Sequence, residues 1–336
     1  MAFVNPVKTF GLLLGLTTVF AAHAQTARAQ EVIKGDGGTV RLLYSEFGSN
    51  SFPATAMKKF ELDKKHGIVI ELVPSASDKA RMATLQAGGA EVATLDWGDV
   101  SRMRKAGVDI VGVSPFLRLG ADFSVVPVNS PIKNLGDLKG KKFGVYNRNS
   151  LDFILERAVA KSKYQVDLDK EATIQEGAGP LMWALMDQGQ LDGTEAFNSV
   201  APAMIATGKY RVLAKVSDLV TQLGLPETPY LFYAFNGAWV KAHPQNTRAF
   251  VAAYHDVIDL LRTNDQFWID RGAEMKMPPE VAAGFRKEAR GDFLRSFSPT
   301  AEADIKKVFE TLLPIAGPGV FGLTEIPDGI LTLDYQ

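Results

Sequence analysis

The run SPIKNLGDLKGKKFGVYNRNSLDFIL, residues 130–155, carries the clearest structural signal in this chain. Within it, the short apolar run KFGVY (Lys142–Tyr146) predicts a strand, and the polar turn Asn147–Ser150 follows directly. A helix is predicted over Leu151–Ser162, because its apolar residues recur at helical spacing and form one face. A strand that leads through a short turn into such a helix is the repeating unit of a parallel α/β sheet.

The same alternation extends toward the N-terminus. The predicted strands there are Val40–Tyr44, Ile68–Val73, Glu91–Leu95 and Asp109–Val113, and the predicted helices are Pro53–Lys65 (with Ser51 as its cap), Asp78–Ala87 and Val100–Lys105. A further strand, Ser124–Val128, contains Pro127, which is typical of an edge strand or a crossover.

The alternation also extends toward the C-terminus. The predicted elements are strands Ala172–Gln175, Leu191–Ala196 and Tyr210–Val216, helices Pro180–Asp187 and Val200–Thr207, and the apolar aromatic run Tyr230–Trp239, after which the chain is mostly helical. The sequence contains no internal repeat and no flexible linker. It therefore predicts two α/β units that are joined by strand crossovers.

Length and composition agree with two lobes and exclude several classes of protein. The chain has 336 residues, and single hydrophobic cores stop growing at about 250–300 residues. The 46% hydrophobic and 22% charged fractions argue against disorder, and the net charge of −1 argues against a nucleic-acid-binding protein. The absence of cysteine excludes disulfides, thiolate nucleophiles, cysteine-ligated zinc, iron–sulfur clusters and lipid attachment through cysteine.

Residues 1–29 have the layout of a secretory signal peptide. Lys8 supplies the positive region, Phe10–Ala22 supplies the apolar region, and small-residue patterns predict cleavage after Ala24 or Ala29. The alternative, a membrane anchor, would need about 20 apolar residues. We therefore expect an exported, soluble periplasmic protein without a lipid anchor.

Candidate binding residues occupy the turns that follow the predicted strands, because ligands of open α/β sheets bind outside the carboxyl ends of the strands. These turns carry small polar or aromatic side chains at helix starts, where exposed N–H groups favour anionic ligand atoms. For each residue the alternative is purely structural: a helix cap, a core aromatic or a solvated turn. The candidates are Asn50, Ser51, Ser77, Asp96, Trp97, Arg148, Asn149, Ser150, Glu195, Phe197 and Tyr230.

Enzyme signatures are absent from the sequence. It contains no Walker A loop, no G-x-S-x-G elbow and no H-E-x-x-H motif. The histidines that follow the signal, His66, His243 and His255, have no carboxylate or nucleophile partner at a useful spacing. The sequence therefore predicts no catalytic residue, no metal site and no cofactor.

Several runs resemble periplasmic solute-binding proteins of ABC importers, in the nitrate, sulfonate, taurine and thiamine-precursor group. The resemblance is clearest for residues 130–155 and extends over LQAGGAEVATLDWGDV (85–100), ALMDQGQLDGTEAF (184–197), APAMIATGKYRVLA (201–214) and YAFNGAWVKAHPQNTRAFVAAY (233–254). The chain departs from the family pattern at Glu91, where Asp is usual, at Arg148, where small residues are usual, and at Phe197–Asn198, where a Trp-containing pattern is common.

The resemblance implies the two-lobed type II periplasmic-binding-protein fold, which closes by a hinge around one small molecule. It implies chain crossings near Ser124–Val128 and Leu231–Phe235. The expected lobes are therefore residues 35–124 with 235–336, and residues 125–234. The expected partners are a small-molecule ligand and an inner-membrane ABC permease, with no nucleic acid, and the receptor is expected to be a monomer.

Two ligand classes stay open. In a sulfonate-like anion site, Arg148 would pair with the charge. In a site for amino-heteroaromatics that resemble thiamine precursors, Asp96 and Glu195 would accept from N–H groups. In both cases the ligand would be packed by Trp97, Phe197 and Tyr230 and hydrogen-bonded by Ser51, Ser77, Asn149, Ser150 and nearby backbone N–H groups.

Two other functions are possible on the same fold. One is a dehydratase-like enzyme that uses Asp96 and Glu195 as acid and base; the cysteine-dependent pyrimidine-synthase branch is excluded because the chain has no cysteine. The other is a ligand-loaded partner of a membrane sensor kinase.

Overall fold

The computed structural model describes residues 1–3, 32–45, 49–75 and 78–336. The chain divides into two units, Met1–Val32 and Ile33–Gln336, and all described helices and strands lie in the second unit. The predicted cleavage sites and apolar region of the signal peptide lie outside the described residues, as does Ser77. In the described part of the chain, no helix is long and apolar enough to cross a membrane.

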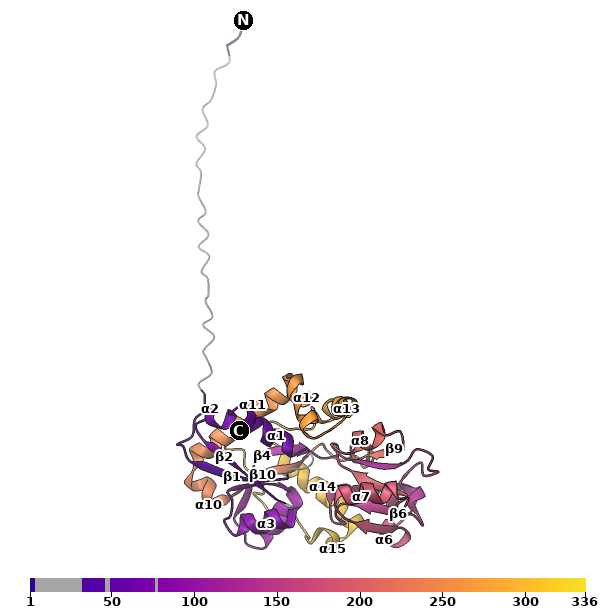
Figure 1. The fold of residues 1–336 in the computed structure, drawn as a ribbon. Coiled ribbons are helices and arrows are strands. Elements are labelled where there is room, and N and C mark those ends of the chain that lie inside the picture. Colours follow the sequence, from indigo (N-terminus) through magenta and orange to yellow (C-terminus); the bar gives the residue numbers. More distant parts are fainter. Residues whose placement is uncertain (4–31, 46–48, 76–77) are drawn as a thin grey trace. The chain divides into compact units, whose positions relative to one another are not determined.

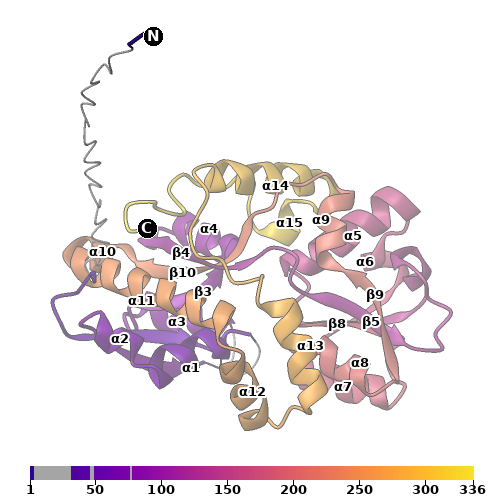
Figure 2. The same cartoon turned by 90° about the horizontal axis from the view of Figure 1, so that it is seen from above.

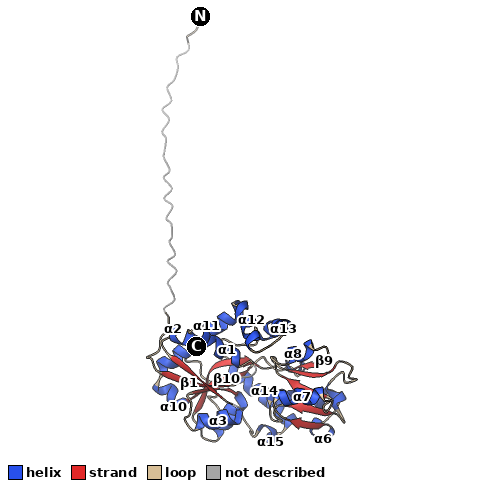
Figure 3. Ribbon diagram, in the orientation of Figure 1, coloured by secondary structure: helices blue, strands red, loops and turns tan. Residues whose placement is uncertain are grey.

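The first sheet contains five strands in the order β2-β1-β3-β10-β4. Figures 1 and 3 show the region of β1 and β10 with the helices around it. Strand β1 pairs in parallel with β2 and β3, whereas β10 runs antiparallel between β3 and β4. The strands are β1 (Thr39–Tyr44), β2 (Val69–Pro74), β3 (Val92–Asp96), β4 (Ile110–Arg118) and β10 (Pro229–Asn236).

Helices that adjoin these strands along the chain pack against the faces of the first sheet and bury them. The long helix α11 packs against α1, and its Tyr254 lies 4.8 Å from Tyr233 of β10, ring centre to ring centre. The helices are α1 (Ser51–Lys59), α2 (Leu62–Lys65), α3 (Asp78–Gln86), α4 (Trp97–Lys105), α10 (Gly237–Ala242), α11 (Pro244–Thr263) and α12 (Asp265–Glu274).

The second sheet also contains five strands, in the order β7-β6-β8-β5-β9. Strand β6 is parallel to β7 and β8, and β5 is antiparallel to β8 and β9. The strands are β5 (Phe123–Pro127), β6 (Lys142–Val145), β7 (Thr173–Glu176), β8 (Gly193–Ala196) and β9 (Tyr210–Lys215). The helices are the 3₁₀ turn η1 (Leu135–Leu138), α5 (Leu151–Tyr164), α6 (Leu168–Glu171), α7 (Gly179–Asp187), α8 (Ala201–Ala206) and α9 (Val216–Gln222).

The C-terminal helices pack against the helices of the second sheet. Helix α13 (Pro279–Ala289) lies beside α8, and α14 (Ala301–Ala316) lies beside α5 (Figure 2). A short helix, α15 (Pro318–Phe321), follows. The lobe boundaries predicted from the sequence stay a prediction. In the structure, α13 and α14, which belong to the predicted first lobe (residues 235–336), contact α8 and α5 of the predicted second lobe (residues 125–234).

The strand and helix pattern expected from the sequence is present, with local differences. The predicted helix Pro53–Lys65 is two helices, α1 and α2, because Glu61 between them adopts a left-handed conformation with φ of 50°. Of the two positions predicted for β5, the edge is wrong, because β5 is an inner strand, and the crossover is confirmed, because the chain passes from β4 of the first sheet to β5 of the second. Pro127 is the last residue of β5, where its missing backbone N–H disrupts the hydrogen bonds between neighbouring strands least. The run Tyr230–Trp239 forms β10 and the start of α10.

Candidate functional site

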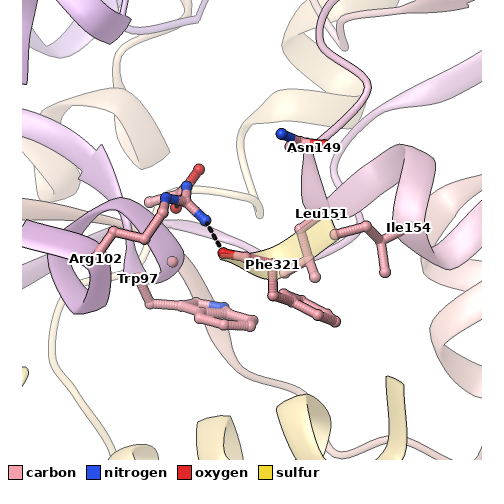
Figure 4. A pocket seen from close by; sticks show the side chains of 8 residues that line it. Trp97, Arg102, Asn149, Leu151, Ile154 and Phe321 are labelled. Atoms are coloured by element: carbon pink, nitrogen blue, oxygen red, sulfur yellow. Dashed lines mark hydrogen bonds and ion pairs between the residues drawn. The ribbon is translucent and has the colours of Figure 1, made fainter. Parts of the chain in front are cut away.

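A pocket lies where the end of β3 faces the start of α5 (Figure 4). Its enclosed volume is only about 10 Å³, about the space of one water molecule, and it reaches about 220 Å³ when the open space at its mouth is included. Residues from both sheets and from the C-terminal segment form its walls: Asp96, Trp97, Gly98, Arg102, Asn149, Leu151, Ile154 and Phe321. Three of the candidates from the sequence, Asp96, Trp97 and Asn149, therefore meet at one place.

Asp96 and Arg102 order the wall contributed by the first sheet. Asp96 is the N-cap of α4, and its Oδ1 accepts a hydrogen bond from the Asp99 backbone N–H at 2.6 Å. Arg102 donates from Nη1 to the Phe321 carbonyl oxygen at 3.0 Å, which ties α4 to α15 (Figure 4). The first interaction fixes the start of α4, and the second fixes its last turn against α15.

Trp97 is part of the protein core as well as of the pocket wall. Its side chain is 1% exposed, and its ring packs edge-on against Phe309 of α14, with centroids 6.5 Å apart. Its indole Nε1 has no hydrogen-bond partner among the described residues. A buried N–H without a partner is unusual and costs stability.

The opposite wall is the start of α5. Ser150 caps this helix, because its Oγ accepts from the Phe153 backbone N–H at 3.3 Å. Asn149 is exposed, and its backbone N–H donates to Asn147 Oδ1 at 2.9 Å. Leu151 and Ile154 supply the apolar part of the wall. The turn after β6 therefore combines a structural cap with an exposed amide side chain at the pocket.

Four buried carboxyl groups, which we call the acid cluster, lie next to this wall. They belong to Asp122, which precedes β5, to Asp152 and Glu156 of α5, and to Glu195 of β8, and none of them is more than 7% exposed. Asp122 lies close enough to Asp152 that, after burial, its charge contributes to raising the pKa of Asp152.

Three of the four carboxyl groups of the acid cluster accept a hydrogen bond from the protein. Asp122 Oδ1 accepts from the Asn198 backbone N–H at 2.8 Å, and Glu195 Oε2 accepts from the Tyr146 backbone N–H at 2.9 Å. Glu156 Oε1 accepts from Ser124 Oγ. The remaining oxygens Asp152 Oδ1, Glu156 Oε2 and Glu195 Oε1 are buried and have no partner among the described residues.

Burial raises the pKa of every member of the acid cluster. It raises the pKa of Asp122 to about 7 and the pKa of Glu156 to about 8. The pKa values of Asp152 and Glu195 lie well above their ordinary values, first because of burial and then because neighbouring carboxylates repel a further charge. Among the described residues, no ion pair joins Lys, Arg or His to the acid cluster. Arg157 instead lies 3.3 Å from Asp169.

An aromatic pair adjoins the acid cluster. The rings of Tyr146 and Phe197 are stacked, with centroids 3.8 Å apart and planes 8° from parallel. The Tyr146 hydroxyl oxygen accepts from the Phe197 backbone N–H at 2.9 Å. Phe197 keeps 38% of its surface exposed, so the pair offers an aromatic surface at the ends of β6 and β8.

The remaining candidates from the sequence lie elsewhere or serve the fold. Asn50 Nδ2 donates to Thr94 Oγ1 at 3.4 Å. Ser51 is buried as the first residue of α1, so it is not the cap of that helix. Arg148 Nη2 donates to the Ile174 carbonyl oxygen at 2.7 Å, which directs its guanidinium toward β7. Tyr230 is half-buried in β10 and packs against the core.

Asp122, Tyr146, Asp152 and Glu156 are not among the candidates predicted from the sequence. A signal for two of them is present, because Asp152 and Glu156 are four residues apart in a largely apolar helix and so share one face. Their burial depends on packing against β5 and β8. Among the described residues, no group of three or more His, Cys, Asp or Glu side chains could hold a metal ion, the acid cluster included.

Comparisons with solved structures show the same fold. The alkanesulfonate-binding protein SsuA from Xanthomonas axonopodis pv. citri bound to MOPS has a TM-score of 0.73 at 17% identity, covering 88% of this chain and 98% of that chain. The periplasmic aliphatic sulphonate binding protein SsuA from Escherichia coli has a TM-score of 0.66 at 19% identity, covering 82% and 85%.

A nitrate-binding protein is also similar in structure. The periplasmic nitrate-binding protein NrtA from Synechocystis PCC 6803 has a TM-score of 0.59 at 12% identity, covering 74% of this chain and 69% of that chain. The fold is therefore that of the two-lobed periplasmic binding proteins.

Sequence comparison gives the family. No curated protein matches this chain. The sequence profile described as NMT1/THI5 like matches residues 64–266, which is more than half of the chain and includes β2 to β10. The chain therefore belongs to the NMT1/THI5-like family.

Proposed function

We propose that this protein is a periplasmic solute-binding receptor that captures one small organic solute and delivers it to an ABC importer. The observation that carries the proposal is the pocket whose walls come from both sheets, from Asp96 and Trp97 on one side and from Asn149 and Leu151 on the other. A ligand at this place would touch both halves of the fold at once.

Binding in such a site is coupled to a change of conformation. A ligand that contacts both walls stabilises the closed arrangement more than the open one, so it shifts the population toward the closed state. The permease would recognise that closed state. The similar structures support a binding role, because three of them are named as sulfonate- or nitrate-binding proteins.

The proposed ligand contacts are the candidates that lie at the pocket or at the neighbouring strand ends. Trp97 and Phe197 would pack on the ligand, and Asn149 would hydrogen-bond it. Asp96 and Glu195 would accept from N–H groups. An anionic ligand would instead need Arg148 to leave Ile174 and Asp169, with which it interacts in this structure.

The test is to identify the solute that the protein retains. The mature chain is purified from periplasmic extract, and the molecule released on denaturation is identified by mass spectrometry. The same compound, added at 100 times its Kd to stripped protein, should stabilise the folded state by about 2.7 kcal/mol. Turnover of the compound by the purified protein, or the absence of any bound or stabilising solute, would contradict the proposal.

A further inference from the structure

One face of helix α13 is anchored to the helices of the first sheet. Val281, Ala282 and Phe285 of this helix are buried. The Phe285 ring packs edge-on against Phe52 of α1 and Trp268 of α12, with ring centroids 4.8 Å and 5.5 Å apart. These aromatic contacts fix the position of α13 relative to α1 and α12.

A neighbouring face of α13 contacts the second sheet and its helices. Gly284 and Glu288 are four residues apart, so they share one side of the helix. Gly284 faces Pro202 of α8, because a Cβ at this glycine would lie 3.7 Å from the Pro202 Cβ. Glu288 Oε2 accepts from Nζ of Lys215, the last residue of β9, at 3.4 Å. Figures 1 and 2 both show α13 between α12 and α8, so this helix connects the two parts of the fold.

Asp292, which follows α13, makes a second connection between the same two parts. Asp292 is 2% exposed, and its Oδ1 accepts from Nε of Arg118, the last residue of β4, at 2.6 Å. Its Oδ2 accepts from Nδ2 of Asn198, in the turn after β8, at 3.3 Å. Asn198 is fully buried. The Asp292 carboxylate therefore bridges the end of β4 and the turn after β8.

The two sides of α13 differ in the cost of separating them from their neighbours. Pulling Phe285 away from Phe52 and Trp268 would expose a large apolar surface to water, which is strongly unfavourable. On the other side, the side chains of Lys215 and Glu288 are 43% and 41% exposed, and water replaces the partners of such an ion pair at little cost. When the two parts of the fold move apart, α13 should therefore stay with the first sheet.

We propose that the contacts Lys215–Glu288 and Asn198–Asp292 form a latch that holds the receptor closed and that separates when the receptor opens. This inference rests on the proposed binding function and adds a regulation of the same site. None of these four residues lines the pocket at the end of β3, so the latch would set the residence time of the solute without touching it. Because the solute leaves from the open state, the loss of a latch contact raises the open population and speeds release.

The first test measures distances between pairs of labels on introduced cysteines, since the chain has none of its own. Lys287→Cys with Ala206→Cys reports the distance from α13 to α8, and Lys287→Cys with Ile269→Cys reports the distance from α13 to α12; all three positions are exposed. Protein as purified, with its retained solute, is compared with protein that has been stripped by unfolding and refolding. We expect stripping to lengthen the α13–α8 distance and to leave the α13–α12 distance unchanged.

Two results of this test would overturn the latch. The first is a change in the α13–α12 distance at a constant α13–α8 distance, because α13 would then move with the second sheet. The second is a constant value of both distances in a receptor in which labels on α3 and α7 still respond to the solute.

The second test exchanges the charges of the exposed ion pair. Glu288→Lys and Lys215→Glu each replace an attraction by a repulsion, so each should speed the loss of retained solute on dialysis, followed by mass spectrometry, about threefold. The double variant restores an ion pair and should lose the solute more slowly than either single variant. Glu280→Lys is the control, because it reverses a charge on the exposed first turn of α13, about 12 Å from Glu288 along the helix, and should leave the rate unchanged.

The buried contact of the latch is tested with Asn198→Ala. This variant leaves Asp292 Oδ2 without its donor in the closed state, so we expect about tenfold faster loss of the solute. The urea midpoint of the stripped variant is measured alongside. A lower midpoint with an unchanged rate of solute loss would show that the Asn198–Asp292 bond serves stability alone and would remove it from the latch.

The outcomes separate the latch from the receptor function. Rates of solute loss that are the same in the charge-exchange variants, in Asn198→Ala and in the unmodified protein would overturn the latch and leave the receptor function standing. If the protein as purified contains no solute and no compound stabilises it, the proposed function fails, and the inference fails with it.

Discussion

Ser124 Oγ of β5 donates a hydrogen bond to Glu156 Oε1 of α5, and both side chains are fully buried. This bond joins the strand by which the chain enters the second sheet to the helix that forms one wall of the pocket. It leaves Glu156 Oε2 without a partner among the described residues. Glu156 is therefore a buried carboxyl group on the helix that forms one pocket wall. Among the described residues, only one of its two oxygens accepts a hydrogen bond.

Stability of the ligand-free protein should fall as the pH rises from 6.5 to 8.5. The pKa values of Asp122 and Glu156 are raised to about 7 and about 8 in the folded state, so the folded chain holds protons that the unfolded chain has already lost. Their contribution is lost as the pH passes through these folded values. The expected decrease is roughly 2 kcal/mol, measured by urea unfolding at several pH values.

His255 sets the lower end of this pH window. Burial lowers the pKa of His255, so below its ordinary value of 6.5 the unfolded chain gains a proton that the folded chain does not, which opposes the trend. This effect fades above pH 6.5, because the unfolded histidine is about half protonated at pH 6.5 and about one-tenth protonated at pH 7.5. Glu156→Gln should flatten the pH dependence. A stability that is constant or rises between pH 6.5 and 8.5 would contradict the raised pKa values of Asp122 and Glu156.

Trp97→Phe should weaken ligand binding about fivefold to tenfold and also cost some stability. The substitution keeps an aromatic ring against Phe309, but it removes the Nε1 donor, which has no protein partner among the described residues, and part of the buried indole ring. The measurement is Kd for the retained solute, together with the unfolding midpoint.

Trp268→Phe is the matched control for this change. Trp268 is equally buried, but its Nε1 donates to the Leu261 carbonyl oxygen at 2.8 Å. This variant should lose about 1 kcal/mol of stability or more, because an acceptor is left buried, and it should keep its affinity for the solute. If Trp97→Phe keeps its affinity for the solute and Trp268→Phe loses it, Trp97 Nε1 does not face the ligand.

Phe197→Ala should reduce solute affinity with only a small loss of stability. The ring is 38% exposed and stacks on Tyr146, so its removal takes away a contact surface for the ligand and one stacked pair worth about 1 kcal/mol. Leu181→Ala, on the exposed surface of α7, is the control and should keep full affinity. Equal affinities of the two variants would remove Phe197 from the site.

Closure of the two halves on the ligand can be measured because the chain contains no cysteine. The double variant Lys79→Cys with Gln188→Cys places one label on exposed positions of α3 and just after α7. Addition of the retained solute should shift the population toward a shorter distance between the labels, measured by fluorescence transfer or electron-spin resonance. A distance distribution that does not respond to saturating solute would contradict the hinge mechanism.

Periodicity is sufficient to predict most of the elements, since short apolar runs and amphipathic helices are local patterns. The turns after β3 and β6 are also predictable as pocket walls, because the carboxyl ends of parallel strands meet at one edge. The break at Glu61 and the inner position of β5 are not predictable, because a single left-handed residue and a strand order depend on packing across the whole sheet.

The amino-acid order alone thus predicts the α/β class, the family resemblance and the proximity of Asp96, Trp97 and Asn149, which line one pocket in the structure. It also excludes every chemistry that needs cysteine. Only the tertiary structure decides that Arg148 turns toward β7 and that Asp122, Asp152, Glu156 and Glu195 gather in the interior. The formal charge of each side chain can be read from the sequence. The pKa of that side chain, and its need for a partner, depend on burial and on neighbours that are distant along the chain.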